Sequence, residues 1–207
     1  MRLRIQTLTF ILLALLAMAC TNQKKQPAKA PVATQPLKER IVGAWFTEGS
    51  SEQLDDNLMT GYGQRLELNS DGTFKLEALM SVSGEVPYGI TSVPVIAEFG
   101  AEIKGTYAIK GNTLNLTYNS DSVVAHMDPD NITIDDQSYS DQKTVTDIRQ
   151  VMIERLESFG INKKMLEQSL RESVHGKTDS FTDVRADGAE LRMKFDGEEI
   201  VYYWEDC

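Results

Sequence analysis

The sequence predicts a mainly β protein, folded as an antiparallel up-and-down barrel of about eight strands with an inserted two-helix hairpin. Two observations predict the barrel. Apolar and polar residues alternate with a period of two in several short runs, and tight-turn sequences separate neighbouring runs. The hairpin is predicted by a stretch in which apolar residues recur every three or four positions. Closing such a meander into a barrel removes the free edges of its outermost strands.

The alternating pattern begins at Ile41, and Gly43-Ala44-Trp45 lies on the first predicted strand. The clearest alternating runs are 65–68, 74–78, 106–110, 114–119, 190–195 and 200–204. Most of these runs have one apolar and one polar face, as expected for strands that cover a single core on one side. The last run is apolar on both faces.

Three turn sequences connect adjacent runs. They are Asn69-Ser70-Asp71-Gly72, Lys110-Gly111-Asn112 and Asp196-Gly197. Glycine and asparagine tolerate the positive φ angles that tight hairpins require. Strands that are adjacent in sequence are therefore expected to pair with each other.

The helical segment covers about residues 143–175. Its apolar residues include Ile148, Met152 and Leu156 in a first helix, and Met165 and Leu170 in a second. Gly160 is placed to end the first helix, Asn162 to cap the second, and His175-Gly176 to end it.

The N-terminus has a different character. Arg2 and Arg4 precede an apolar run that is too short to span a membrane, and small residues lead directly to Cys20. This pattern resembles a bacterial lipoprotein signal, in which the cysteine is acylated, with palmitate for example, and becomes the first mature residue. The expected organisation is a signal peptide at 1–19, a lipidated cysteine and flexible tether at 20–37, and one folded domain at 38–207. An ordinary secretory signal and a membrane anchor are the alternatives.

Attachment to a membrane is therefore expected through Cys20. Thr21 is not the aspartate that retains lipoproteins at the inner membrane in well-studied sorting systems, so analogy indicates the outer membrane of a bacterial cell envelope. The tether lacks the acidic residues next to the cysteine that direct some lipoproteins to the cell surface, which favours the periplasmic face. The net charge of −10 argues against nucleic acid as a partner.

The segments 38–120 and 180–206 together resemble the lipocalin-like domains of lipoproteins from the Bacteroidetes group. The resemblance rests on a Gly-x-Trp motif, Gly43-Ala44-Trp45, after a possible short helix at 37–40, and on the hairpins around Asn69–Gly72 and Lys110–Asn112. It implies that Trp45 closes the barrel floor beneath a basic side chain, a role that Arg192 could fill by cation–π contact. The inserted helices depart from the usual lipocalin order.

The sequence contains little that is typical of an enzyme. Its two histidines, His126 and His175, lie far apart and match no catalytic or metal-binding motif. The acidic stretch at 128–136 does not match an EF-hand, because Ile132 stands where an oxygen ligand is needed. We therefore expect neither catalysis, nor a metal, nor a cofactor.

The apolar segment 83–100 is interrupted by Pro87, Gly89 and Pro94, which argues against a regular central strand. It is expected to be either an irregular edge strand or a flap over the barrel mouth. In the first functional hypothesis the barrel binds a small apolar or amphipathic ligand. Its candidate contacts are Tyr88, Phe99, Tyr107, Tyr118 and Tyr202. In the alternative, a filled barrel is a structural scaffold for another envelope protein.

Overall fold

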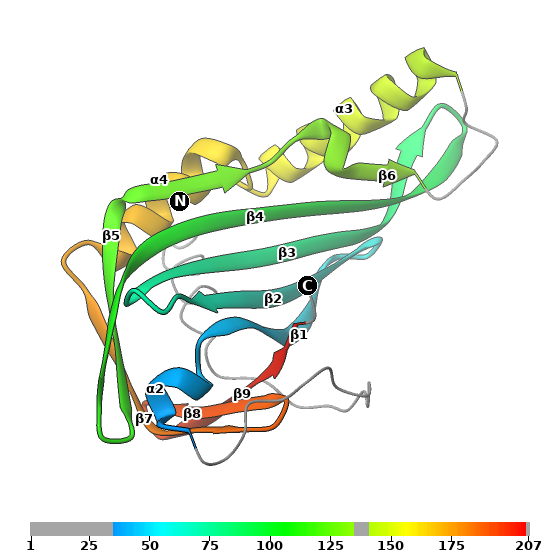
Figure 1. Cartoon of the computed structure of the whole chain (residues 1–207). Helices are drawn as coiled ribbons and strands as arrows, with labels where there is room; N and C mark the ends of the chain where they lie inside the picture. Colours follow the sequence, from blue (N-terminus) through cyan, green and yellow to red (C-terminus); the bar gives the residue numbers. More distant parts are fainter. Residues whose placement is uncertain (1–34, 135–140, 206–207) are drawn as a thin grey trace.

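The computed structural model describes residues 35–134 and 141–205 (Figure 1). The strands are β1 (Gly43–Asp55), β2 (Leu58–Leu68), β3 (Thr73–Tyr88), β4 (Thr91–Lys110), β5 (Thr113–His126), β6 (Ile132–Ile134), β7 (Thr178–Asp187), β8 (Glu190–Phe195) and β9 (Glu198–Trp204). The helices are α2 (Leu37–Arg40), α3 (Gln142–Ser158) and α4 (Lys163–Val174), with a short 3-10 helix, η1 (Pro129–Asn131). The predicted signal segment, Cys20 and most of the tether lie outside the described residues.

All strands except β6 form a closed antiparallel barrel, which confirms the predicted fold class. The order around the barrel is β3-β2-β1-β9-β8-β7-β5-β4, and β4 pairs back with β3. β6 pairs with β4 beyond this ring. The contact between β1 and β9 is short, since it consists of two residue pairs, Trp45 with Trp204 and Phe46 with Tyr203. Beyond Phe46, no strand within 35–134 or 141–205 pairs with the edge of β1 that faces β9.

The three predicted turns connect hairpins. They join β2 to β3, β4 to β5 and β8 to β9. Gly72, Gly111 and Gly197 all have positive φ angles, as tight turns require. Two register shifts interrupt the pairing of β1 with β2, between Glu48 and Ser51 and between Gln53 and Asp55.

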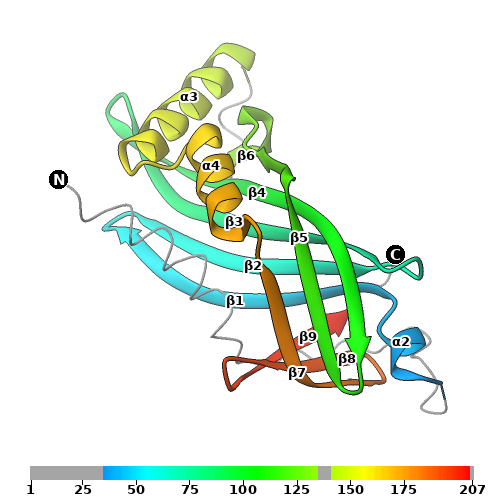
Figure 2. The same ribbon diagram turned by 90° about the vertical axis from the view of Figure 1, so that its left-hand side faces the viewer.

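The expectation of an irregular segment at 83–100 is wrong. These residues form the C-terminal part of β3 and the N-terminal part of β4, which we call the far ends of the two strands because they lie farthest from β7, β8 and β9. The two strands pair regularly up to Tyr88 and Thr91 around a two-residue turn. Proline lacks the backbone N–H group that could donate a hydrogen bond to a neighbouring strand. Pro87 and Pro94 are accommodated because this part of the hairpin lies at the end of the sheet, where fewer strands are neighbours. The hairpin extends beyond the region closed by β7, β8 and β9 (Figures 1 and 2).

The two predicted helices are present between β6 and β7. Asn162 caps α4, because its side chain accepts a hydrogen bond from the Met165 amide at 3.0 Å. Gly160, at φ +79°, follows α3 as expected. The helices cover different parts of the sheet. Residues of α3 pack on the far ends of β3 and β4, whereas α4 packs on β5 and the middle of β4.

The core of the barrel is built around Trp45. This side chain is fully buried, and its indole N–H donates a hydrogen bond to the Ile41 carbonyl at 2.7 Å. Its ring meets Trp204 edge to face, with the ring centroids 5.0 Å apart. Gly43 is required beside them, because a Cβ at this position would lie 2.2 Å from the Trp204 ring. The Gly-x-Trp motif therefore lets the two strands approach where the barrel closes.

The expected contact between Arg192 and Trp45 is wrong. Alternation along β8 places Leu191 and Met193 in the core and Arg192 on the outside of the barrel. There Arg192 pairs with Glu190 at 2.7 Å and Glu199 at 3.3 Å. The ring that packs on Trp45 is that of Trp204.

Replacing Trp45 with alanine is expected to lower the free energy of unfolding by about 3–5 kcal/mol, the usual cost of truncating a large buried aromatic side chain. Urea denaturation measures this value. Tyr203→Ala is the control, because Tyr203 is 48% exposed on the strand next to β1. It should cost less than about 1 kcal/mol. Equal losses for the two variants would contradict the central position of Trp45.

Candidate functional site

The five predicted ligand contacts do not form one site. Tyr107 and Tyr202 belong to the barrel core, and Tyr118 packs against it. Phe99 belongs to the separate core beneath α3, and Tyr88 packs on that core. Truncating Tyr88 or Phe99 would therefore disturb the packing of the hairpin on α3, which makes these positions poor probes of ligand uptake.

The hydroxyl groups of the three barrel tyrosines bind other parts of the protein. Tyr107 donates a hydrogen bond to the Asn69 carbonyl, Tyr118 to Asp179 Oδ2 and Tyr202 to Gln64 Oε1, at 2.7, 2.8 and 2.8 Å. Burial raises the pKa of Tyr118 well above its usual value, and the negative charge of Asp179 raises it further. Burial also raises the pKa of Tyr202. These groups consequently stabilise the barrel as neutral hydrogen-bond donors.

An open hollow of about 470 Å³ lies elsewhere, on the outside of the sheet formed by β1 to β4. We call it the outer hollow. Its lining residues are Phe46, Glu48, Gly49, Ser50, Ser51, Gly61, Tyr62, Gly63, Leu79, Met80, Ser81, Glu98 and Phe99. Buried Thr47 and Gln64 point into the barrel, so their neighbours Glu48 and Gly63 face outward.

Two rows of paired residues cross the outer hollow. One row runs Glu48, Gly63, Leu79, Gly100, and the next runs Ser51, Gly61, Ser81, Glu98, from β1 to β4 in each case. Glycine or serine occupies most of these positions. The hollow therefore exists because small residues coincide on four adjacent strands, where ordinary side chains would fill the surface.

The surroundings of the outer hollow are apolar and acidic. The Phe46 ring lies against Gly63, since a Cβ added there would be 3.3 Å from its nearest carbons. Leu79, Met59 and Ile96 are 38%, 45% and 40% exposed on the same outward face. Glu48 and Glu98 are the charged residues of the lining. The face thus combines apolar surface with carboxylates, and no basic residue lines the described part of the hollow.

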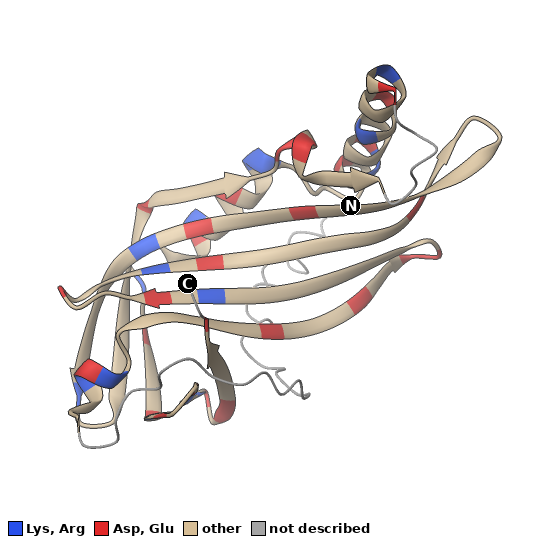
Figure 3. Ribbon diagram, turned by 45° about the vertical axis from the view of Figure 1, so that its right-hand side comes forward, with Lys and Arg blue, Asp and Glu red and all other residues tan. Residues whose placement is uncertain are grey.

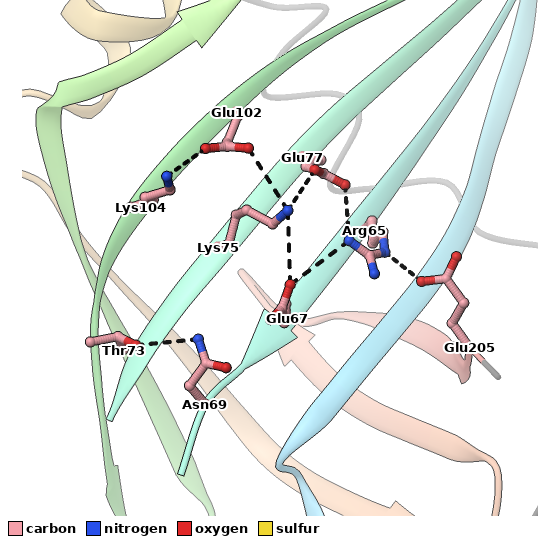
Figure 4. A network of polar contacts seen from close by, with 9 residues as sticks. All are labelled: Arg65, Glu67, Asn69, Thr73, Lys75, Glu77, Glu102, Lys104 and Glu205. Atoms are coloured by element: carbon pink, nitrogen blue, oxygen red, sulfur yellow. Dashed lines mark hydrogen bonds and ion pairs between the residues drawn. The ribbon is translucent and has the colours of Figure 1, made fainter. Parts of the chain in front are cut away.

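A network of ion pairs occupies the same face nearer the barrel core (Figure 4). Lys75 lies 2.9 Å from Glu77, and Lys104 lies 2.9 Å from Glu102. Arg65 lies 3.3 Å from Glu77 and also binds Glu205. The carboxylates raise the pKa values of Arg65 and Lys75, chiefly because Arg65 donates a hydrogen bond to Glu205 and Lys75 donates one to Glu77. The basic groups beside the hollow are therefore bound to neighbouring carboxylates.

A second hollow, of about 320 Å³, lies between the end of β5, η1 and the start of α4. It includes His126, Asp128 and Lys163. His175 lies apart, with its Nδ1 3.2 Å from Ser120 Oγ. In the part of the chain that the structure describes, no three histidine, cysteine or acidic side chains gather where they could hold a metal ion. No described helix has the length and hydropathy needed to cross a membrane.

The outer hollow was missed at the sequence level, although a signal was present. Gly61-Tyr62-Gly63 places two glycines at alternate positions of one strand, so both lie on the same face. Ser81 and Ser83 repeat the pattern on β3. Only the register between strands shows that these small residues meet, and that register was not predicted.

Two comparisons of the sequence with known proteins find no relatives. A scan of the chain against protein-family models finds no match, and a search of curated proteins finds no significant similarity.

The buried tyrosines predict a loss of stability at high pH. Above pH 10, unfolded tyrosines lose their protons while Tyr118 and Tyr202, with raised pKa values, keep theirs in the folded state. The free energy of unfolding should therefore fall by up to about 1.4 kcal/mol per pH unit for each such tyrosine. Urea denaturation between pH 8 and pH 11 measures the slope.

The variants Tyr118→Phe and Tyr202→Phe should each make this slope shallower, although both lower stability at neutral pH by leaving a buried acceptor without its donor. Tyr203→Phe, on the outside of β9, is the matched control for the loss of one tyrosine hydroxyl group. Identical slopes in all variants would show that neither buried tyrosine determines the alkaline behaviour.

Proposed function

We propose that this protein is a lipid-anchored, non-enzymatic binding lipoprotein of a bacterial cell envelope, with a lipocalin-like barrel as its folded domain. The β-barrel fold is compatible with a binding module. The N-terminal pattern before Cys20 supports the anchor, and the acidic composition disfavours polyanionic partners. The ligand in this proposal is a small apolar or amphipathic molecule.

The outer hollow is the observation that carries the proposal. Its volume of about 470 Å³ falls within the range that small-molecule sites occupy. Phe46 and Leu79 offer apolar surface, while Ser51, Ser81 and two carboxylates offer hydrogen-bond acceptors. An amphipathic ligand can use both kinds of contact. In this proposal the ligand site lies on the outside of β1 to β4 and not at the barrel mouth.

A structural scaffold is the second candidate function. The outward-facing side chains of Met59, Leu79 and Ile96 favour it, because neighbouring exposed apolar residues on one sheet face are typical of protein contacts. In this alternative an envelope protein covers the face, and the hollow accommodates one of its side chains.

Ser81→Phe tests the small-ligand proposal. Ser81 lines the hollow on an outward position of β3, so the new ring should fill the hollow without entering the core. Ser83→Phe is the matched control, because it adds the same ring to the same face of β3, two residues further along. Thermal shifts of the wild type and both variants are measured against a panel of neutral, anionic and cationic amphiphiles.

We expect at least one amphiphile to raise the melting temperature of the wild type and of Ser83→Phe, and to have little effect on Ser81→Phe. Equal stabilisation of Ser81→Phe would place the binding site elsewhere. A panel with no binding compound would favour the scaffold function.

Cys20→Ala tests the anchor. Two or three acyl chains hold a protein firmly on a membrane, so the wild type should sediment with envelope membranes and the variant should move to the soluble fraction. Protection of the wild type from protease on intact cells would support the periplasmic face. A variant that stays with the membrane would contradict anchoring through Cys20.

A further inference from the structure

The two carboxylates of the outer hollow stand on opposite sides of it. Glu48 belongs to β1 and Glu98 to β4, and β2 and β3 lie between them. Three spacings between neighbouring strands, together with the offset of one row along the strands, separate their backbones by about 16 Å. A ligand that contacts both carboxylates must therefore be extended and must cross the strands.

The floor between the two carboxylates is suited to hydrocarbon. Gly61 exposes part of its backbone on β2, the Phe46 ring covers the buried Gly63, and Leu79 supplies a further apolar contact beside them. Ser51 and Ser81 lie in the same row as Glu98, where their hydroxyls can accept a hydrogen bond. The middle of a ligand on this floor is expected to be an alkyl chain.

The charges on the part of the sheet around the outer hollow favour the binding of a cation. The segments 47–63 and 78–100 contain no lysine, arginine or histidine, whereas their acidic residues are Glu48, Glu52, Asp55, Asp56, Glu85 and Glu98. Arg155 of α3 binds Asp55 at the end of β1, and neither residue lines the hollow. Charges on the barrel side of the hollow are paired within the ion-pair network (Figures 3 and 4). A positive ligand meets attraction at both sides, and a negative ligand meets repulsion.

Two separate carboxylates select for two separate positive groups. Both glutamates are exposed, so a single ion pair contributes at most about fivefold in affinity. A ligand with a cation at each end gains the second contact without a second loss of translational freedom. A monocation of the same length lacks this gain.

We propose that the outer hollow binds a linear organic dication, an alkyl chain with an ammonium group at each end, with Glu48 and Glu98 holding the two ends. This inference rests on the proposed function and names the chemical class of its amphipathic ligand.

The probe is octamethylenediamine, titrated into the full chain by calorimetry at low salt. Octylamine, octanedioate and the shorter tetramethylenediamine are compared with it. The variants are Glu48→Gln, Glu98→Gln and the double variant. Glu198→Gln, on β9 outside the hollow, is the control for the loss of one surface charge.

We expect octamethylenediamine to bind more tightly than the other three compounds, and its binding to weaken as the salt concentration rises. Each single variant should lose about threefold to fivefold in affinity and the double variant about tenfold or more. Glu198→Gln should bind as the wild type does.

The inference is overturned if the double variant binds octamethylenediamine as tightly as the wild type does, or if octylamine binds equally well. If Ser81→Phe then prevents octylamine from binding, the proposed function is still supported. If Ser81→Phe blocks neither these compounds nor any amphiphile of the panel, the proposed function falls as well.

Discussion

The closure of the barrel between β1 and β9 is the constraint on which the rest of the structure depends. Only two residue pairs connect these strands within the described residues, so backbone hydrogen bonds alone hold them weakly. The edge-to-face contact of Trp45 with Trp204 adds buried apolar area at this joint. Arg65 of β2 reaches across β1 to bind Glu205, just after β9. Side-chain contacts therefore hold β1 and β9 together where backbone pairing between the two strands is short.

This short closure divides the sheet into two regions with different surfaces. Where β9 is present, the sheet wraps around a core and its outside carries paired charges. Beyond Phe46, β1 to β4 continue toward α3, which provides the second core. Because α3 covers the inner face there, the outer face can carry small residues without exposing the core. The outer hollow is therefore a consequence of extending the strands beyond the barrel.

Local signals were sufficient to predict much of the fold. Period-two runs, turn glycines and the three-to-four spacing at 143–175 each act within a few residues, and the structure confirms the barrel and its two helices. Pro87 and Pro94 misled the interpretation, because a proline is unfavourable in a central strand but tolerated near the end of a long hairpin. The site depends on which residues of four strands share a row. A single sequence does not contain that information directly, so Glu48 and Glu98 gave no sign of belonging together.

The two register shifts of β1 affect how this protein meets other molecules of its kind. Between Glu48 and Ser51 the strand has two residues, Gly49 and Ser50, opposite Tyr62, and a second irregularity follows Gln53. Such bulges twist an exposed strand and interrupt its ladder of N–H and C=O groups. A strand from another copy thus finds no long regular template beyond Phe46. The irregularity of β1 guards an open sheet edge against aggregation, a risk that grows when many copies are concentrated on one surface.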